Sequence, residues 1–220
     1  MPAWISRSIF SPMGFPNARH IAFLKGLVFA ACLTPLAVLV VQALQGALGA
    51  NPIEAVIRSL GDWALRFLLV TLAVTPLRRL TGWPWLVKFR RMLGLFAFFY
   101  AVLHLMAYVG LDQFFDGSAI GRDILKRPFI TLGFMAFLLL IPLAVTSTQA
   151  MIRRLGGRRW QTLHRAVYAV AVLGVLHYFW LVKLDLTQPL LHAGLLGLLL
   201  GARILWRVLE NRPSTRGLHP

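Results

Sequence analysis

The strongest constraint on this chain is a repeated pattern of long apolar runs. Six runs occur, at roughly residues 24–44, 60–77, 92–109, 129–145, 163–182 and 190–209. A helix of about 20 apolar residues crosses the hydrocarbon core of a bilayer. Backbone polar groups in lipid must be paired within helices or a closed barrel. The pattern therefore predicts an all-α membrane protein, a bundle of six transmembrane helices in which residues 1–220 form a single domain.

Charged residues gather in the connections between these runs. The basic connections hold Arg78, Arg79, Lys88, Arg90 and Arg91, then Arg153, Arg154, Arg158 and Arg159, and finally Arg212 and Arg216. The alternate connections hold Asp112, Asp116, Asp123 and Asp185. Short loops rich in Lys and Arg stay in the cytoplasm. The pattern therefore predicts that both termini are cytoplasmic.

The formal net charge of +16 also has to be explained. A strongly basic chain can be a nucleic-acid-binding protein, but here the arginines lie in short loops beside apolar spans. That distribution is typical of membrane topology. We therefore expect membrane lipid, and no nucleic acid, to be the partner of these loops.

Two histidines lie at matching depth in the third and fifth runs. His104 and His177 follow the basic ends of their runs by about 12 and 14 residues, which is roughly 18–21 Å of helix. Two imidazoles at one depth on facing helices can clamp one flat metal macrocycle, and histidine is a standard axial ligand of heme. The alternative is that each ring only bonds a neighbouring carbonyl. No Cys-x-x-Cys-His motif occurs, so covalent heme attachment is excluded.

The other histidines are less clearly placed. His164 lies 13 residues before His177, which is roughly 20 Å lower and about 140° around an ideal helix. It could bind a different cofactor, act as a weak second ligand, or lie in the polar interface. His192 lies near the start of the sixth run at a depth near that of His177, so it is an alternative axial ligand. His20 and His219 lie outside the runs and are assigned no role.

Three segments carry a resemblance to a known family. They are "FRRMLGLFAFFYAVLHLMAYV", "RRWQTLHRAVYAVAVLGVLHYFW" and "NPIEAVIRSLGDWALRFLLVTLAVTPLRRLTG". The chain resembles the ferric-reductase-like transmembrane group and, within it, the heme-binding membrane subunits of bacterial methionine sulfoxide reductase systems. The resemblance implies a multi-pass protein of the bacterial inner membrane with b-type heme (heme b) and FMN. It also implies electron transfer to a periplasmic molybdopterin-containing reductase that repairs oxidised methionines in proteins.

Carried over by motif, the heme-associated histidines of this family fall on His104, His164 and His177. Larger members of the group have two histidines on each ligand-bearing helix. Here Arg91 stands where the lower histidine of the third run would be, which argues against a complete second bis-histidine site. The sequence ends soon after the sixth run, so we expect a separate electron donor. The resemblance suggests quinol or a cytoplasmic flavin reductase.

Three arginines are further candidates for cofactor binding. Arg66 follows Asp62 by one helical turn, so it either pairs with Asp62 and anchors the helix or contacts the carboxylates of the heme. Arg90 and Arg91 lie at the base of the run that carries His104. The resemblance to a flavin-binding family suggests that they capture the FMN phosphate. The alternative is that they are topology charges near lipid headgroups.

Taken together, these features predict a heme-containing electron-transfer subunit, an oxidoreductase component whose partner holds the catalytic centre. The alternative from another class is a small transporter or proton channel that uses the intramembrane histidines as a relay. Against that alternative, the runs contain almost no acidic residues and no evident pair of discontinuous helices.

Overall fold

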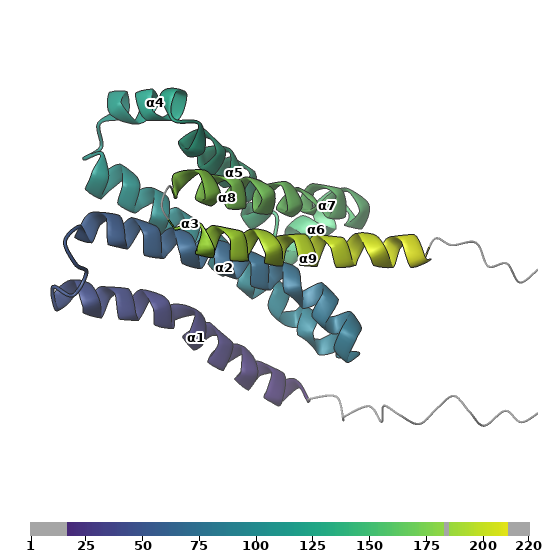
Figure 1. Ribbon diagram of the computed structural model, residues 1–220. Coiled ribbons are helices and arrows are strands. Elements are labelled where there is room, and N and C mark those ends of the chain that lie inside the picture. The colour runs from purple at the N-terminus through teal and green to yellow at the C-terminus, as the bar shows by residue number, and fades with distance from the viewer. Residues whose placement is uncertain (1–16, 183–184, 211–220) are drawn as a thin grey trace, which may run out of the picture.

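Helices make up all the regular structure between residues 17–182 and 185–210, which are the residues that this computed structural model describes. No strand occurs in these two ranges. In chain order, the elements are α1 (Ala18–Leu44), α2 (Pro52–Thr81), a 3-10 turn (Pro84–Leu86), α3 (Val87–Ala107), a π-helical turn (Tyr108–Asp112), α4 (Gly117–Lys126), α5 (Pro128–Val145), α6 (Gln149–Leu155), α7 (Gly157–His164), α8 (Ala166–Leu181) and α9 (Thr187–Glu210) (Figure 1). His219, Arg212 and Arg216 lie outside the described residues.

Six helical segments of the described chain are long and apolar enough to cross a membrane. They are Ala18–Leu44, Pro52–Thr81, Pro84–Asp112, Pro128–Val145, Gly157–Leu181 and Thr187–Glu210. The predicted all-α bundle of six spans is therefore confirmed, and the chain is a multi-pass membrane protein.

Most of the helices are longer than the apolar runs that predicted them. α2 begins at Pro52, well before residue 60, because the Asn51 side chain caps it by accepting a hydrogen bond from the Glu54 N–H, and Pro52 suits the first turn. It ends at Gly82, whose φ of 70° is a left-handed helix cap. Hydropathy marks only the part of a helix that lies in hydrocarbon, so it misses the polar first and last turns.

Two short helices in the connections were not predicted. α4 is capped by Asp116, whose carboxylate accepts hydrogen bonds from the N–H groups of Ser118 and Ala119. α6 is capped by Thr148, whose hydroxyl accepts a hydrogen bond from the Met151 N–H. Side-chain caps of this kind make short polar helices possible, and hydropathy does not detect them. The fifth span is also divided, because α7 ends at His164 and α8 begins at Ala166.

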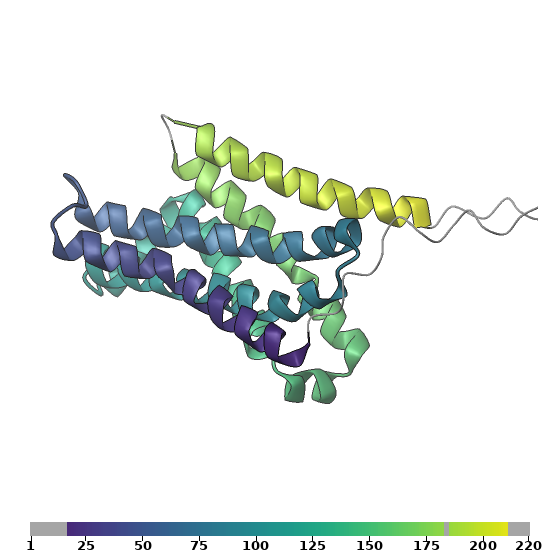
Figure 2. The same cartoon turned by 90° about the horizontal axis from the view of Figure 1, so that it is seen from below.

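α2 lies at the centre of the bundle and contacts α1, α3, α8 and α9. The most extensive contacts of the molecule are those of α2 with α3 and of α5 with α8. α1 lies at one edge, as Figures 1 and 2 show, and only 11% of its apolar window is buried, against 50% for α2. α1 is therefore the least buried of these spans, and α2 is the most buried.

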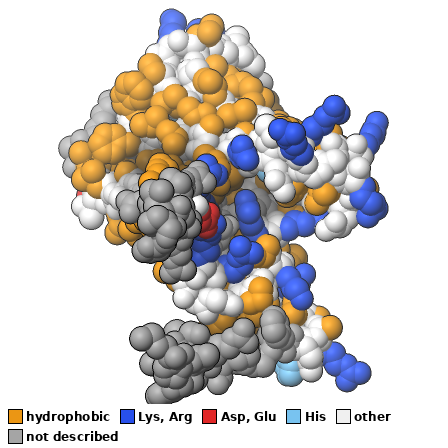
Figure 3. Space-filling model, turned by 90° about the vertical axis from the view of Figure 1, so that its right-hand side faces the viewer, with side chains coloured by type: hydrophobic (Ala, Val, Ile, Leu, Met, Phe, Trp, Pro, Cys, Tyr) orange, Lys and Arg blue, Asp and Glu red, His pale blue; other side chains and the backbone are white. Residues whose placement is uncertain are grey.

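The two ends of the bundle differ in charge. Figure 3 looks onto the end at which the α2–α3 connection, α6, α7 and the end of α9 lie, and Lys and Arg side chains gather over it. Of the basic residues predicted between runs two and three, Arg78 and Arg79 lie in the last turn of α2 and Lys88, Arg90 and Arg91 at the start of α3. Those predicted between runs four and five, Arg153, Arg154, Arg158 and Arg159, lie in α6 and α7. We refer to this end as the basic end. The opposite end contains the α1–α2 turn and α4.

Candidate functional site

The third and fifth spans bring two imidazole rings together in the interior. The ring centres of His104 on α3 and His177 on α8 are 6.2 Å apart, and the ring planes cross at 76°. The two residues are separated by 73 positions in the sequence, so only the packing of the spans explains their meeting. The prediction that these two histidines share one depth is therefore confirmed by their geometry.

Each of the two rings is held by a backbone carbonyl of a neighbouring span. His104 Nδ1 lies 2.8 Å from the Ile57 carbonyl of α2, and His177 Nδ1 lies 2.6 Å from the Phe129 carbonyl of α5. A carbonyl oxygen only accepts, so both Nδ1 atoms donate. In a neutral imidazole this leaves the lone pair on Nε2. Ligand histidines of metal sites are oriented in this way.

The spacing of the rings fits a metal ion bound by both. A metal–nitrogen bond is about 2 Å and a ring centre lies about 1 Å beyond its nitrogen, so two rings on one ion have centres about 6 Å apart. The observed 6.2 Å agrees with that value. Within the described residues, no group of three or more His, Cys, Asp or Glu side chains could hold a metal ion. The pair itself supplies two ligands, so an ion bound between the two rings would take its remaining ligands from another group.

His164 lies apart from this pair, at the basic end, in a cluster of its own. Its Nε2 is 3.1 Å from the hydroxyl of Thr146, which donates its own proton to the Pro142 carbonyl at 2.6 Å. The hydroxyl therefore accepts from His164, and Nε2 carries the proton in this arrangement. The indole of Trp160 stacks on the imidazole at 4.0 Å and donates to the Thr146 carbonyl. The predicted separation of His164 from His177 is thus observed.

His192 is the most buried of the described histidines, with 4% of its surface exposed. Its Nδ1 bonds the Gln188 carbonyl of its own helix at 2.7 Å, and its ring meets the edge of Tyr178 at 5.6 Å. Tyr178 in turn faces the Asp62 carboxylate of α2. His192 therefore belongs to a polar cluster between α2, α8 and α9.

Arg66 is not brought to the histidine pair. Its guanidinium lies 4.9 Å from the Trp63 ring centre and 3.9 Å from Asp62. Arg66 follows Ile57 by nine residues, which is about 180° around an α-helix, so it faces away from the side of α2 that holds His104. The contacts are those of an arginine that pairs locally and anchors its helix.

The side chains of Arg90 and Arg91 point in different directions from α3. Arg91 lines a small cavity of about 60 Å³ between α2, α3, α5 and α8, together with Ser147. Arg90 is close enough to act electrostatically on His164 and on Arg203. Adjacent residues of a helix lie about 100° apart, which explains the separation. Arg90 therefore lies toward His164 and Arg203, and Arg91 lies toward the cavity.

Arg203 was not among the predicted site residues, although it lies within the sixth apolar run. Its guanidinium lies 5.4 Å from the Tyr168 ring centre and donates to the Leu199 carbonyl at 3.2 Å and to the Leu72 carbonyl. It therefore connects α9 to α2 and α8 at the level of Arg90. An arginine between apolar residues of a span is itself a signal of a functional or packing role.

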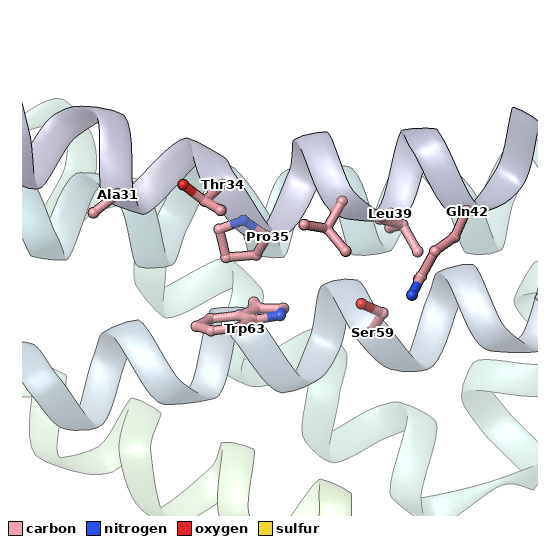
Figure 4. Close-up of a pocket in the computed structure, with 8 residues that line it drawn as sticks. Ala31, Thr34, Pro35, Leu39, Gln42, Ser59 and Trp63 are labelled. Carbon is pink, nitrogen blue, oxygen red and sulfur yellow. The ribbon is translucent and has the colours of Figure 1, made fainter.

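A groove opens between α1 and α2 at the edge of the bundle. Its volume is about 490 Å³. Figure 4 shows the Gln42 amide of α1 and the Ser59 hydroxyl of α2 pointing toward each other across it, with the Trp63 ring beneath Pro35. The remaining lining residues are Ala31, Thr34, Val38 and Leu39. The groove therefore combines an apolar wall with several hydrogen-bonding groups.

Comparison with known proteins supplies the family. A family model described as "Ferric reductase like transmembrane component" matches residues 60–175. The protein-methionine-sulfoxide reductase heme-binding subunit MsrQ of Rhodospirillum rubrum is 60% identical over 185 residues, which are 84% of this chain and 89% of that protein. This chain belongs to the MsrQ family.

Further MsrQ proteins are similar over almost the whole chain. The one from Azospira oryzae is 54% identical and covers 93% of this chain and 89% of its own length. The one from Caulobacter vibrioides is 52% identical and covers 93% of this chain and 96% of its own length. The resemblance inferred from the sequence motifs is therefore confirmed at the level of the family.

Proposed function

We propose that this chain is the heme-binding, electron-transfer subunit of a protein-methionine-sulfoxide reductase system, with one b-type heme held between His104 and His177. The observation that carries the proposal is the ring pair itself: centres 6.2 Å apart, with both Nδ1 atoms bound to carbonyls. The printed name of the MsrQ relatives, "heme-binding subunit", supports the same group.

The bound heme supplies a one-electron couple, and the residues of this chain set its surroundings. His104 and His177 would hold the heme iron through Nε2, and the carbonyls of Ile57 and Phe129 fix the ring orientations and make the imidazoles more basic. The spans packed around the pair exclude water from it. Axial ligation, hydrogen bonding and low polarity each change the reduction potential of a heme.

The position of the pair supports electron flow toward the periplasm. The Ile57 carbonyl lies in the first half of α2, and the Phe129 carbonyl lies in the first turn of α5. Both of these segments lie toward the end opposite the basic end. We place the basic end in the cytoplasm by the positive-inside rule, so the heme lies nearer the periplasm of the bacterial inner membrane. Its electron acceptor is a periplasmic molybdopterin-containing methionine sulfoxide reductase catalytic subunit, which repairs oxidised periplasmic proteins.

Two electron donors fit different parts of the molecule. A quinol dissolved in the lipid could enter the groove between α1 and α2, where Gln42, Ser59 and Trp63 offer hydrogen bonds to its ring oxygens. The groove is separated from the His104 side of α2 by one helix, about 10 Å across. A cytoplasmic flavin reductase would instead act at the basic end, with FMN near His164, Arg90 and Arg91.

The decisive experiment is the cofactor content of the protein purified in mild detergent. The proposal predicts one low-spin heme per chain with a bis-histidine absorption spectrum, reducible by a quinol analogue or by flavin reductase. It also predicts that the reduced heme is oxidised by the catalytic subunit in the presence of methionine sulfoxide. Protein without a Soret band would overturn the proposal and leave the transporter or proton-channel alternative.

The double variant Gln42→Ala/Ser59→Ala in the groove distinguishes between the two electron donors. Slower reduction by the quinol analogue, with unchanged reduction by dithionite, identifies quinol as a donor that docks in the groove. Unchanged reduction by the quinol analogue removes the groove from the pathway and favours the flavin route.

A further inference from the structure

The two histidine contacts repeat one local arrangement. On α2, the Ile57 carbonyl binds His104 and Gly61 follows Ile57 by four residues. On α5, the Phe129 carbonyl binds His177 and Gly133 follows Phe129 by four residues. The histidine lies 47 residues after its carbonyl in the first case and 48 in the second. The two helix pairs with the most extensive contacts, α2 with α3 and α5 with α8, thus contain the same arrangement of carbonyl, glycine and histidine.

Each glycine lies directly against an imidazole ring. A Cβ atom at Gly61 would lie 3.0 Å from His104 Nδ1 and from its Cε1. A Cβ atom at Gly133 would lie 2.8 Å from His177 Nδ1 and 2.9 Å from its Cε1. Real Cβ atoms essentially never come closer than 3.0 Å, and even 3.0 Å is unusually tight. A ring atom would therefore have to move at both positions.

Helix geometry explains why the glycine follows the carbonyl by four residues. The carbonyl of residue i points along the helix toward residue i+4, whose N–H it accepts, and the Cβ of residue i+4 tilts back toward that carbonyl. A side chain there covers the second lone pair of the oxygen. Glycine at i+4 leaves that lone pair open to a donor from a neighbouring helix, and Nδ1–H is this donor in both pairs.

Backbone conformation does not account for these two glycines. Both lie inside helices, and neither has a positive φ, unlike Gly46, Gly49 and Gly82. Glycine in a helix interior costs about 1 kcal/mol relative to alanine. The close approach of the histidine ring is the feature that offsets this cost.

We propose that Gly61 and Gly133 are positioning residues for heme ligation: each exposes the carbonyl that orients one axial imidazole, and together they hold the two imidazole planes crossed. The inference rests on the proposed heme between His104 and His177. The angle of 76° between the ring planes is the property that the glycines set. Axial imidazoles with crossed planes give a strongly anisotropic low-spin EPR signal, whereas parallel planes give a more rhombic one, so the angle is measurable.

The experiment compares glycine-to-alanine variants of the full-length protein in detergent. Gly61→Ala and Gly133→Ala are the test variants. Gly94→Ala on α3 and Gly174→Ala on α8 are matched controls, because they lie on the ligand-bearing helices themselves and an added Cβ meets only ordinary contacts of 3.6 and 3.5 Å. Heme per chain, the low-spin EPR signal and the thermal unfolding of the heme-free protein are measured for all four variants.

The test variants should bind heme roughly 10- to 100-fold more weakly, the range found when partners of metal-ligating residues are lost. Their remaining EPR signal should shift toward the rhombic form. Gly133→Ala should show the larger change, because its Cβ contact is the shorter. The heme-free test variants should unfold close to the wild-type temperature, because the helix propensity gained with alanine offsets the contact that each glycine loses at its imidazole ring. The controls should keep the wild-type heme content and signal.

Either of two results would overturn the inference. One is a wild-type EPR signal and heme content in both test variants. The other is the same change in the controls as in the test variants, which would mean that any added methyl group disturbs the bundle. Failure of the proposed function is distinguishable, because in that case the wild-type protein itself shows no bis-histidine heme.

Discussion

The hydroxyl of Tyr100 accepts a hydrogen bond from the backbone N–H of Leu36, 64 residues away in the sequence, at 3.1 Å. The same hydroxyl donates to the Cys32 carbonyl at 2.8 Å. In a regular helix, Leu36 N–H and the Cys32 carbonyl would bind each other. Pro35 lies between them, and α1 bends near its middle (Figure 1). Tyr100 therefore bridges the backbone pair that the proline-containing turn separates, and this joins α1 to α3.

Removal of that hydroxyl should destabilise the protein without removing heme. Tyr100 has 0% of its surface exposed, so Tyr100→Phe leaves a backbone N–H and a carbonyl unpaired in an apolar interior. Each such group costs about 1–3 kcal/mol. Thermal unfolding in detergent should show the loss. Tyr168→Phe is the control, because Tyr168 interacts with Arg203 through its ring. Equal stability of wild type and Tyr100→Phe would show that the bridge contributes nothing.

If His104 and His177 hold the heme as proposed, loss of either histidine should abolish most low-spin heme. His104→Ala or His177→Ala leaves the iron without one strong axial ligand. His164→Ala should spare most of that signal, because His164 lies in a separate cluster with Thr146 and Trp160. Absorption and EPR spectra of the three purified variants provide the measurement. A normal bis-histidine spectrum in His177→Ala would show that His177 is not a heme ligand, and His192 would then be the next candidate.

Replacement of the two arginines tests the flavin site. If Arg90 and Arg91 hold the FMN phosphate, the change of both to Gln should lower flavin affinity about 10-fold or more, because hydrogen bonds to charged groups contribute about 1.5–3 kcal/mol each. Heme content should stay constant.

The ratio of flavin to heme is the deciding quantity for these arginines. If they serve only as topology charges, the double variant will insert poorly or give a low yield, while the ratio in correctly inserted protein stays constant. That result would remove both residues from the flavin site.

Orientation in the membrane can be measured with reporter fusions. Fusions after Gly157 and at the C-terminus should report a cytoplasmic location, and fusions near Gly117 should report the periplasm. The reason is the asymmetry of Lys and Arg between the two ends of the bundle. The inverse pattern would place the histidine pair near the cytoplasm and reverse the proposed direction of electron flow.

Acid should loosen the start of α4. The hydroxyl of Ser118 and the N–H groups of Ser118 and Ala119 bind the Asp116 carboxylate and hold its pKa below the ordinary value of 3.8. A depressed pKa means that the cap stabilises α4 above the ordinary pKa and is lost as the pH falls through the depressed value. Hydrogen exchange of the two amides, corrected for its intrinsic pH dependence, should rise at acid pH. Asp116→Asn keeps an uncharged cap and should remove this pH dependence.

Hydropathy and charge along the sequence were sufficient for the spans and for the histidine pair. Both depend on position along a helix, and a rise of 1.5 Å per residue converts that position directly into depth. The basic connections were equally visible, because loop charge needs no knowledge of packing. These properties are local, so the sequence by itself determined that the protein is a six-span bundle with His104 and His177 at one level.

The neighbours around each helix were decided by tertiary packing alone. Arg66 turns away from His104, and Arg90 and Arg91 separate toward different partners, because the rotation of a mostly apolar helix cannot be read from its composition. The roles proposed for Gly61 and Gly133 are visible only in the folded bundle, where a histidine ring of another span lies within 3.0 Å of the position that a Cβ atom would occupy at each glycine. A lipid environment makes apolar faces nearly equivalent, so close packing and backbone hydrogen bonds between spans select the faces that meet.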